Sequence, residues 1–135
     1  MMQTYTVQSR QREELIDITH LAQKAVDESG LKSGLVFCFV PHTTAGITIN
    51  ENADPDVQRD ILYKLQKEIP QSDSYHHAEG NSDAHLKASL MGFSQQVLVE
   101  DKQLVLGTWQ GIYFCEFDGP RSRRVIIKVL PIGKD

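Results

Sequence analysis

The alternation of apolar and polar residues along the chain predicts a protein built mainly of short strands. Runs with a two-residue period, or runs that are apolar throughout, are typical of strands. The run 34–40 is apolar at every position after its glycine, as expected of a strand covered on both faces, and 45–51 is its predicted partner strand. The full set of predicted strands is 3–9, 13–18, 34–40, 45–51, 94–100, 103–107, 111–118 and 122–130.

Two longer segments repeat their apolar residues every three or four positions, as one face of a helix does. The first covers 20–29, with Thr19 as its expected N-cap and Gly30 as its stop. The second begins at 54–56, Asp-Pro-Asp, which places a carboxylate at the N-cap and proline at the first helical position. Pro70 ends it.

A polar loop without apolar periodicity, 71–83, follows the second helix. A loop of this length in a compact domain is usually functional or disordered. Asp83 is a suitable N-cap for a short third helix, on which Lys87 is expected to face solvent. Strands with three helices segregated among them predict an α+β fold, in which two mostly antiparallel sheets pack face to face.

Composition and charge narrow the class of protein. The chain has 135 residues, 40% of them hydrophobic and 24% charged, which predicts one domain over 1–135 with a single core. Its net charge of −4 comes from interleaved acids and bases, so we expect no nucleic-acid or membrane partner. The N-terminus does not resemble a secretion signal. Cys38 and Cys115 lie in predicted strands, which favours reduced, buried thiols over a disulfide and predicts a cytoplasmic protein.

Candidate chemistry begins directly after the apolar run 34–40. His42 is held in place by that strand, and its ring either faces a cleft or binds a backbone carbonyl. Thr43 and Thr44 could bind an anion or form a local turn. Glu51 adds a carboxylate at the end of the next predicted strand.

The polar loop is a second candidate, because three of the five histidines and two acids fall within ten residues. Neutral imidazole binds zinc, nickel or cobalt, and a carboxylate can complete the metal shell or orient a ligand. The spacing of His77 and His85 matches no zinc-finger or HExxH pattern. The prediction of a metal site therefore depends on the density of histidines and on His42 joining from elsewhere. A solvated polar loop is the alternative.

The third candidate segment contains the only tryptophan, Trp109, which lies between Gly107 and Gly111. Trp109 could stack on a planar heterocycle or cover one end of the core. Glu116 interrupts an apolar strand, so it needs a partner, and Arg121, a histidine of the site or a metal could serve. The fork of Arg121 suits a phosphate or carboxylate. The arginines at 123–124 are predicted to form a solvated rim on an edge strand.

These segments together resemble the YjbQ-like family of small bacterial and archaeal proteins, often described as secondary thiamine-phosphate synthases. The resemblance implies an α/β sandwich, a homotrimer with sites near subunit contacts, and a metal or anion site lined by His42, His77 and His85. His76 is adjacent to His77, and the distance past Tyr75 favours His77. The stretches that carry the resemblance are 42–45, 49–55, 79–81, 84–89 and 106–113, with Glu116 and Arg121.

The activity that the resemblance implies is a weak transfer of hydroxymethylpyrimidine diphosphate to thiazole phosphate, with release of pyrophosphate. Such a reaction needs positive charge or a divalent metal on the diphosphate, here from Arg121 or zinc, nickel or magnesium. It also needs a flat surface for the pyrimidine, which Trp109 offers. The residues expected to act in catalysis are His42, Glu51, Glu116 and Arg121. The residues expected to bind the small phosphorylated or heterocyclic substrate are Thr43, Thr44, Asn81, Trp109 and Gln110. A non-catalytic metal- or ligand-binding trimer is the alternative function.

Overall fold

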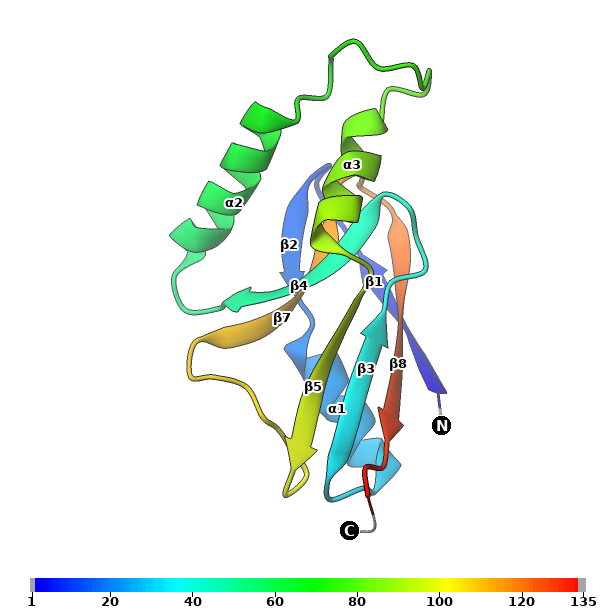
Figure 1. Cartoon of the computed structure of the whole chain (residues 1–135), viewed down its shortest axis with the longest axis vertical. Helices are drawn as coiled ribbons and strands as arrows, with labels where there is room; N and C mark the ends of the chain where they lie inside the picture. The colour runs from blue at the N-terminus through cyan, green and yellow to red at the C-terminus, as the bar shows by residue number, and fades with distance from the viewer. Residues whose placement is uncertain (1, 134–135) are drawn as a thin grey trace.

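The predicted α+β architecture is confirmed by a computed structural model, which describes residues 2–133. Within these residues, one sheet has the strand order β1-β8-β3-β5-β6 and the other has the order β2-β7-β4, and all pairings are antiparallel (Figure 1). The strands are β1 (Met2–Gln8), β2 (Glu14–Asp17), β3 (Gly34–Phe39), β4 (Ala45–Glu51), β5 (Ser94–Glu100), β6 (Gln103–Leu104), β7 (Gln110–Glu116) and β8 (Ser122–Leu130). The helices are α1 (Thr19–Ser29), α2 (Pro55–Glu68) and α3 (Ser82–Met91).

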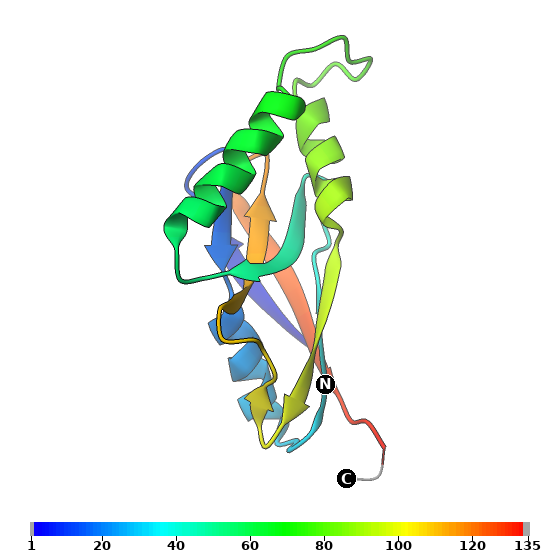
Figure 2. The same ribbon diagram turned by 60° about the vertical axis from the view of Figure 1, so that its left-hand side comes forward.

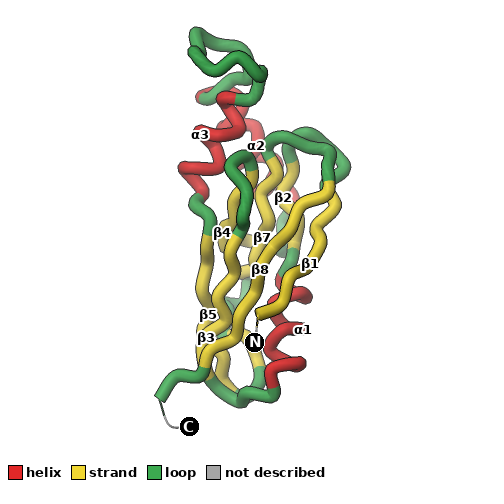
Figure 3. The backbone as a smooth tube through the Cα atoms, turned by 90° about the vertical axis from the view of Figure 1, so that its right-hand side faces the viewer, coloured by secondary structure: helices red, strands yellow, loops and turns green. Residues whose placement is uncertain are grey.

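The core lies between the two sheets. Val36 and Ile127 from the five-stranded sheet are buried in one cluster with Ile47 and Phe114 from the three-stranded sheet. The three-stranded sheet covers only part of its partner, and α1 packs on the remainder with Ala22, Ala25 and Val26 buried in the same cluster (Figures 1 and 3). The loop between α2 and α3 projects from the opposite end of the molecule (Figure 2).

The prediction that 34–40 is covered on both faces is wrong. Only alternate residues of β3, such as Val36 and Cys38, point into the core, whereas Phe39 on the outer face is 40% exposed. The predicted partnership with 45–51 is also wrong, because β3 pairs with β5 and β8 while β4 pairs with β7 in the other sheet. The segment 40–44 carries the chain from one sheet to the other, so β3 and β4 face each other across the core.

The second helix begins as predicted, since a carboxylate oxygen of Asp54 accepts a hydrogen bond from the backbone N–H of Asp56 at 2.9 Å. Gly30 also ends α1 as predicted, with a left-handed φ of 72°. The predicted N-cap Thr19 is instead the first residue of α1. Its N–H and hydroxyl both donate to Asp17, at 2.9 and 2.6 Å, so an acid two residues earlier satisfies the first N–H of the helix.

Asp101 and Lys102 form the tip of the hairpin between β5 and β6, and both adopt positive φ, as a tight hairpin requires. The strand after it is shorter than predicted. Cys38 and Cys115 are buried free thiols, and burial raises the pKa of each to about 12. No helix in the described part of the chain is long and apolar enough to cross a membrane.

The core predicts a large difference between two aromatic truncations. Phe114→Ala removes a fully buried ring between the sheets, and we expect a loss of about 3–5 kcal/mol in the free energy of unfolding. Tyr63→Ala removes a ring that is 62% exposed on α2, and we expect a change within about 0.5 kcal/mol. Urea denaturation of both variants measures the difference, and equal losses would contradict this description of the core.

Candidate functional site

Glu116, at the end of β7, is fully buried beneath the segment that carries His42. One carboxylate oxygen accepts from the hydroxyl of Ser9 at 2.7 Å and from Nε of Arg123 at 2.8 Å. The other accepts from the backbone N–H of Asp118 at 2.9 Å and from Nη2 of Arg123. Arg123 also donates to the hydroxyl of Thr44 at 2.9 Å. The ion pair is therefore saturated by groups of the fold itself.

The partners predicted for this carboxylate are wrong. Arg123, not Arg121, binds Glu116, and Arg123 is buried rather than part of a solvated rim. Strand β8 is not an edge, because it lies between β1 and β3. Burial raises the pKa of Glu116, but hydrogen bonds from Arg123, Ser9 and the Asp118 N–H outweigh it and hold that pKa below its ordinary value. Arg121 remains exposed and binds Asp118 through Nε and Nη2, at 2.8 and 3.2 Å.

A second buried charge cluster joins α3 to the segment between β1 and β2. Asp83 accepts from both terminal nitrogens of Arg12, at 3.1 and 2.9 Å, and from Nζ of Lys87 at 2.8 Å. Lys87 also donates to Glu13 at 3.0 Å. The prediction that Asp83 caps α3 is wrong, because Asp83 is the second residue of that helix, and the prediction that Lys87 faces solvent is wrong, because Lys87 is buried. Burial raises the pKa of Asp83, but Arg12 and Lys87 together lower it by more, so the net shift of this pKa is downward.

His76 and His77 of the polar loop lie close to His85, which belongs to the first part of α3. The rings of His77 and His85 meet edge to face with their centroids 5.3 Å apart, and Nε2 of His77 is 3.3 Å from a carboxylate oxygen of Glu79. Both histidines, with His76 and Ser82, line a cavity of about 390 Å³ that we call the histidine cavity. Two imidazoles and a nearby carboxylate can bind a polar ligand or contribute part of a metal shell.

His42 lies on the connection between β3 and β4, next to the exposed ring of Phe39 in a shallow cavity of about 330 Å³. Its Nε2 accepts the backbone N–H of Arg124 at 2.9 Å, which leaves Nδ1 to carry the proton of the neutral ring. Burial first, and then the charges of three arginines, lower the pKa of His42. These arginines are Arg123, Arg124 and Arg121. The charge of Glu116 acts in the opposite direction but does not cancel the lowering, so the ring is neutral at pH 7.

The three histidines predicted to bind metal do not meet within one chain. Among residues 2–133, no group of three or more His, Cys, Asp or Glu side chains could hold a metal ion. His77 and His85 come together, but His42 lines a different cavity and its Nε2 lone pair already accepts a hydrogen bond. The ligand set of a single chain is therefore incomplete for the expected divalent metal.

The remaining predicted site residues fall into two groups at opposite ends of the three-stranded sheet. Asn81 donates to Asp118 at 2.8 Å, which places it near Arg121. Glu51 of β4 pairs with Gln110 of β7 at the far end of this sheet. This pair lies six residues along the strand from the pair Ala45–Glu116, or about 20 Å. Trp109 precedes Gln110, is 63% exposed, and covers no part of the core. Thr43 is exposed beside His42.

Sequence reasoning missed the buried cations Arg12, Lys87 and Arg123. A signal existed for Arg123, because it shares the inward register of β8 with Val125 and Ile127. Lys87 stands four residues after Asp83, which is the helical spacing of an ion pair. Arg12 offered no comparable local signal, because its partner Asp83 lies 71 residues away.

Comparison with known proteins gives consistent matches over nearly the whole chain. Residues 3–132 match the model of the family described as UPF0047 protein YjbQ-like. A UPF0047 protein of Methanocaldococcus jannaschii is 52% identical over 130 residues, covering 96% of this chain and 94% of the relative. The UPF0047 protein YugU of Bacillus subtilis is 50% identical over 131 residues, covering 96% and 99%.

Solved structures agree with these matches. A crystal structure of an uncharacterised YjbQ/UPF0047 protein from Clostridium acetobutylicum is 59% identical, with a TM-score of 0.94 and coverage of 95% of this chain and 99% of that one. A protein of unknown function from Sulfolobus solfataricus is 35% identical, with a TM-score of 0.92 and coverage of 98% and 97%.

The buried ion pair predicts a strong non-additive effect on stability. Arg123→Met leaves Glu116 buried without its cation, and we expect a loss of about 3–5 kcal/mol in the free energy of unfolding at pH 7. Adding Glu116→Gln removes the unpaired charge, so the double variant should lose less than the sum of the two single variants. Arg124→Met, on the exposed face of the same strand, is the control and should stay close to the wild type.

The same pair predicts a pH dependence. Because the folded pKa of Glu116 is depressed, its contribution is present above the ordinary value of 4.5 and is lost as the pH falls through the folded value. The stability difference between wild type and Glu116→Gln should therefore shrink in acid. Urea denaturation at several pH values measures this, and a difference that grows in acid would be inconsistent with the assignment.

Proposed function

The chain belongs to the UPF0047 family of YjbQ-like proteins, and from this premise we propose that it is an enzyme acting on a small phosphorylated heterocycle. The reaction proposed is that of a secondary thiamine-phosphate synthase, as a weak activity. The ring nitrogen of a thiazole phosphate bonds to the methylene carbon of a pyrimidine diphosphate, while the carbon–oxygen bond breaks and pyrophosphate leaves. The observation that carries the proposal is the position of His42, which is bound by the backbone of Arg124 and lies close to the exposed guanidinium groups of Arg124 and Arg121, an arrangement that suits a phosphorylated ligand.

The anion-binding part of the site consists of His42, Thr43, Arg121 and Arg124. Both arginines are exposed, so their guanidinium groups can reach a ligand without unfolding any part of the chain. The neutral His42 offers its Nδ1–H, since Nε2 is held by the backbone of Arg124. Fixed positive charge and donors of this kind stabilise the negative charge that grows on a leaving diphosphate.

The heterocycle-binding part of the site is proposed to come from the histidine cavity and from Trp109. The exposed indole offers a flat surface for stacking. In one chain these groups lie apart from His42, so the complete site requires residues of more than one subunit. That requirement agrees with the proposal of a homotrimer with its sites at subunit contacts.

The outer face of the five-stranded sheet supports association. The pairing of β3 with β5 and with β8 brings apolar side chains of these three strands next to one another on this face. We call this set the outer apolar face, and it consists of Leu35, Phe37, Phe39, Leu98, Ile126 and Leu130. Leu98 is 57% exposed, which is costly for a protein that remains a monomer. His42 follows this face directly, so burying it would bring His42 to a subunit contact.

Within residues 2–133 one chain supplies no complete ligand set for a divalent metal, so no step of the proposed reaction is assigned to a metal. His77 and His85 are the pair that a chain brings together for such an ion. The alternative function, a non-catalytic ligand-binding trimer, uses the same anion site. Product formation from the two phosphorylated substrates separates the two functions.

The anion site predicts a selective loss of affinity. Arg124→Ala removes one charge beside His42 but keeps the backbone N–H that positions the ring, and we expect pyrophosphate to bind about 10–100-fold more weakly. Arg59→Ala removes an equal charge from the exposed face of α2 and should leave the affinity unchanged. Isothermal titration calorimetry measures both. Wild-type affinity in both Arg124→Ala and Arg121→Ala would remove these arginines from the site.

The outer apolar face predicts the oligomeric state. We expect sedimentation equilibrium at low micromolar concentration to give the mass of a trimer. Leu98→Asp places a charge within the outer apolar face, opposite Leu35, and should dissociate the assembly, whereas Tyr63→Asp on α2 should not. A monomer or dimer for the wild type would contradict the proposal.

A further inference from the structure

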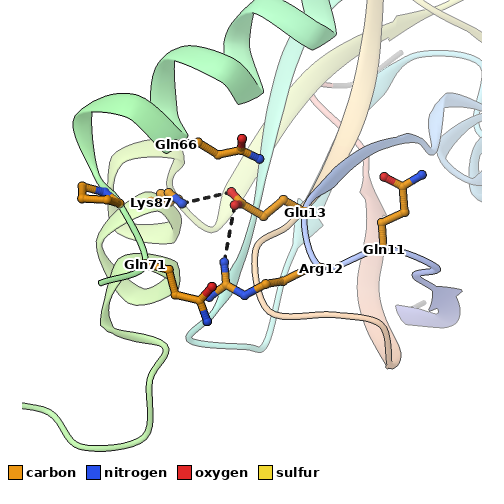
Figure 4. A pocket seen from close by; sticks show the side chains of 7 residues that line it. Gln11, Arg12, Glu13, Gln66, Gln71 and Lys87 are labelled. Carbon is orange, nitrogen blue, oxygen red and sulfur yellow. Dashed lines mark hydrogen bonds and ion pairs between the residues drawn. The ribbon is translucent and has the colours of Figure 1, made fainter. Parts of the chain in front are cut away.

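A cavity of about 430 Å³, which the proposed reaction does not use, lies between the end of α2, helix α3 and the segment between β1 and β2 (Figure 4). Its volume falls within the range of about 300–1,000 Å³ that is usual for small-molecule sites. The residues that line it are Gln11, Arg12, Glu13, Gln66, Pro70, Gln71 and Lys87. We call it the glutamine cavity. None of these residues lines the histidine cavity or the cavity of His42.

The charged residues at and beneath this cavity balance one another. Arg12 and Lys87 bind the carboxylates of Glu13 and Asp83, so the four side chains carry no net charge. Lys87 is 1% exposed, and two of its three ammonium hydrogens are donated, to Asp83 at 2.8 Å and to Glu13 at 3.0 Å. Within residues 2–133 its third hydrogen has no acceptor, although Lys87 lines the cavity. A ligand with a carbonyl oxygen would supply that acceptor.

The other polar groups of the cavity are side-chain amides. Figure 4 shows Gln66 and Gln71 on either side of Lys87. Gln71 donates to the carbonyl of Gly80 at 3.2 Å, which leaves its own carbonyl oxygen available. The side-chain amides of Gln66 and Gln11 form no hydrogen bond with any other residue that the structure describes. A carboxamide presents a donor and an acceptor side by side, so it pairs with an edge of the same kind.

From this arrangement we infer that the glutamine cavity binds a small uncharged molecule with an amide or lactam edge, such as a pyrimidinone or purinone. The ligand carbonyl accepts from Lys87, and its adjacent N–H and carbonyl pair with the amides of Gln66 and Gln71. The four charges at and beneath the cavity are already paired with one another, so a charged ligand would add a charge that none of them is free to balance, which disfavours charged ligands.

The probe for this inference is uracil, which carries lactam edges and no charge. We expect saturable binding of uracil to the full-length protein, measured by isothermal titration calorimetry. Gln66→Leu replaces one amide at an exposed position that contributes no hydrogen bond to the described fold, and it should weaken uracil binding about five- to tenfold. Lys67→Ala, at the neighbouring exposed position outside the cavity lining, should leave the affinity unchanged.

Two related molecules test the chemistry of recognition. 1,3-Dimethyluracil keeps the ring and its carbonyls but lacks both N–H donors, and orotate adds a carboxylate to the same ring. Both should bind at least tenfold more weakly than uracil. Absence of uracil binding, equal binding of either analogue, or unchanged affinity in Gln66→Leu would each overturn the inference.

His85→Ala separates this cavity from the proposed active site. We expect it to leave uracil binding unchanged, because His85 lines the histidine cavity alone. A loss of uracil binding in His85→Ala would assign uracil to the histidine cavity and overturn the inference. Failure of pyrophosphate binding at Arg121 and Arg124 would leave the uracil result unaffected, so the two proposals fail independently.

Discussion

The buried ion pair of Glu116 and Arg123 is the interaction on which the surrounding end of the two sheets depends. Its two members come from different sheets, since Glu116 ends β7 and Arg123 begins β8. Ser9 and Thr44 add hydrogen bonds from the ends of two further segments, so four parts of the chain converge on one carboxylate and one guanidinium. An ion pair without water must be fully hydrogen-bonded to persist, and that demand fixes the geometry of everything attached to it. The backbone N–H next to Arg123 then orients His42.

Much of the architecture could be predicted from local pattern, and the errors have a common physical origin. Alternation located the strands, and Asp54 and Gly30 marked helix ends through chemistry that acts within a few residues. The run 34–40 was wrongly expected to be covered on both faces, because hydrophobicity indicates that a face avoids water and not which chain covers it. The outer side of β3 is apolar and yet exposed in a single chain. Sequence pattern cannot distinguish a face buried by the same chain from one buried by a second copy.

The residues of the candidate site could be predicted from the sequence, but which of them lie close together in space could not. His77 and His85 are close in sequence and meet in space, whereas His42 and Trp109 depend on how distant strands are assembled. Partner choice for Glu116 failed for the same reason. Arg121 and Arg123 are chemically identical, but Arg121 lies in the turn before β8, whereas Arg123 lies within that strand on its inward face. Charge clusters such as Lys87, Asp83 and Arg12 are set by tertiary contacts over tens of residues.

Helix α2 differs from the rest of the molecule in how it is held. None of the residues in α2, all of which the structure describes, is fully buried, and its apolar stripe is only half covered. Gln58, which donates to the hydroxyl of Tyr113 at 2.6 Å, is one of its few polar ties to the sheets. A helix with so little buried surface opens in local fluctuations that leave the core intact, so its amide hydrogens exchange with solvent faster than those of β7 or β8. Exchange protection along α2 would thus report on whatever packs against it, whether a ligand beneath its end or a neighbouring subunit.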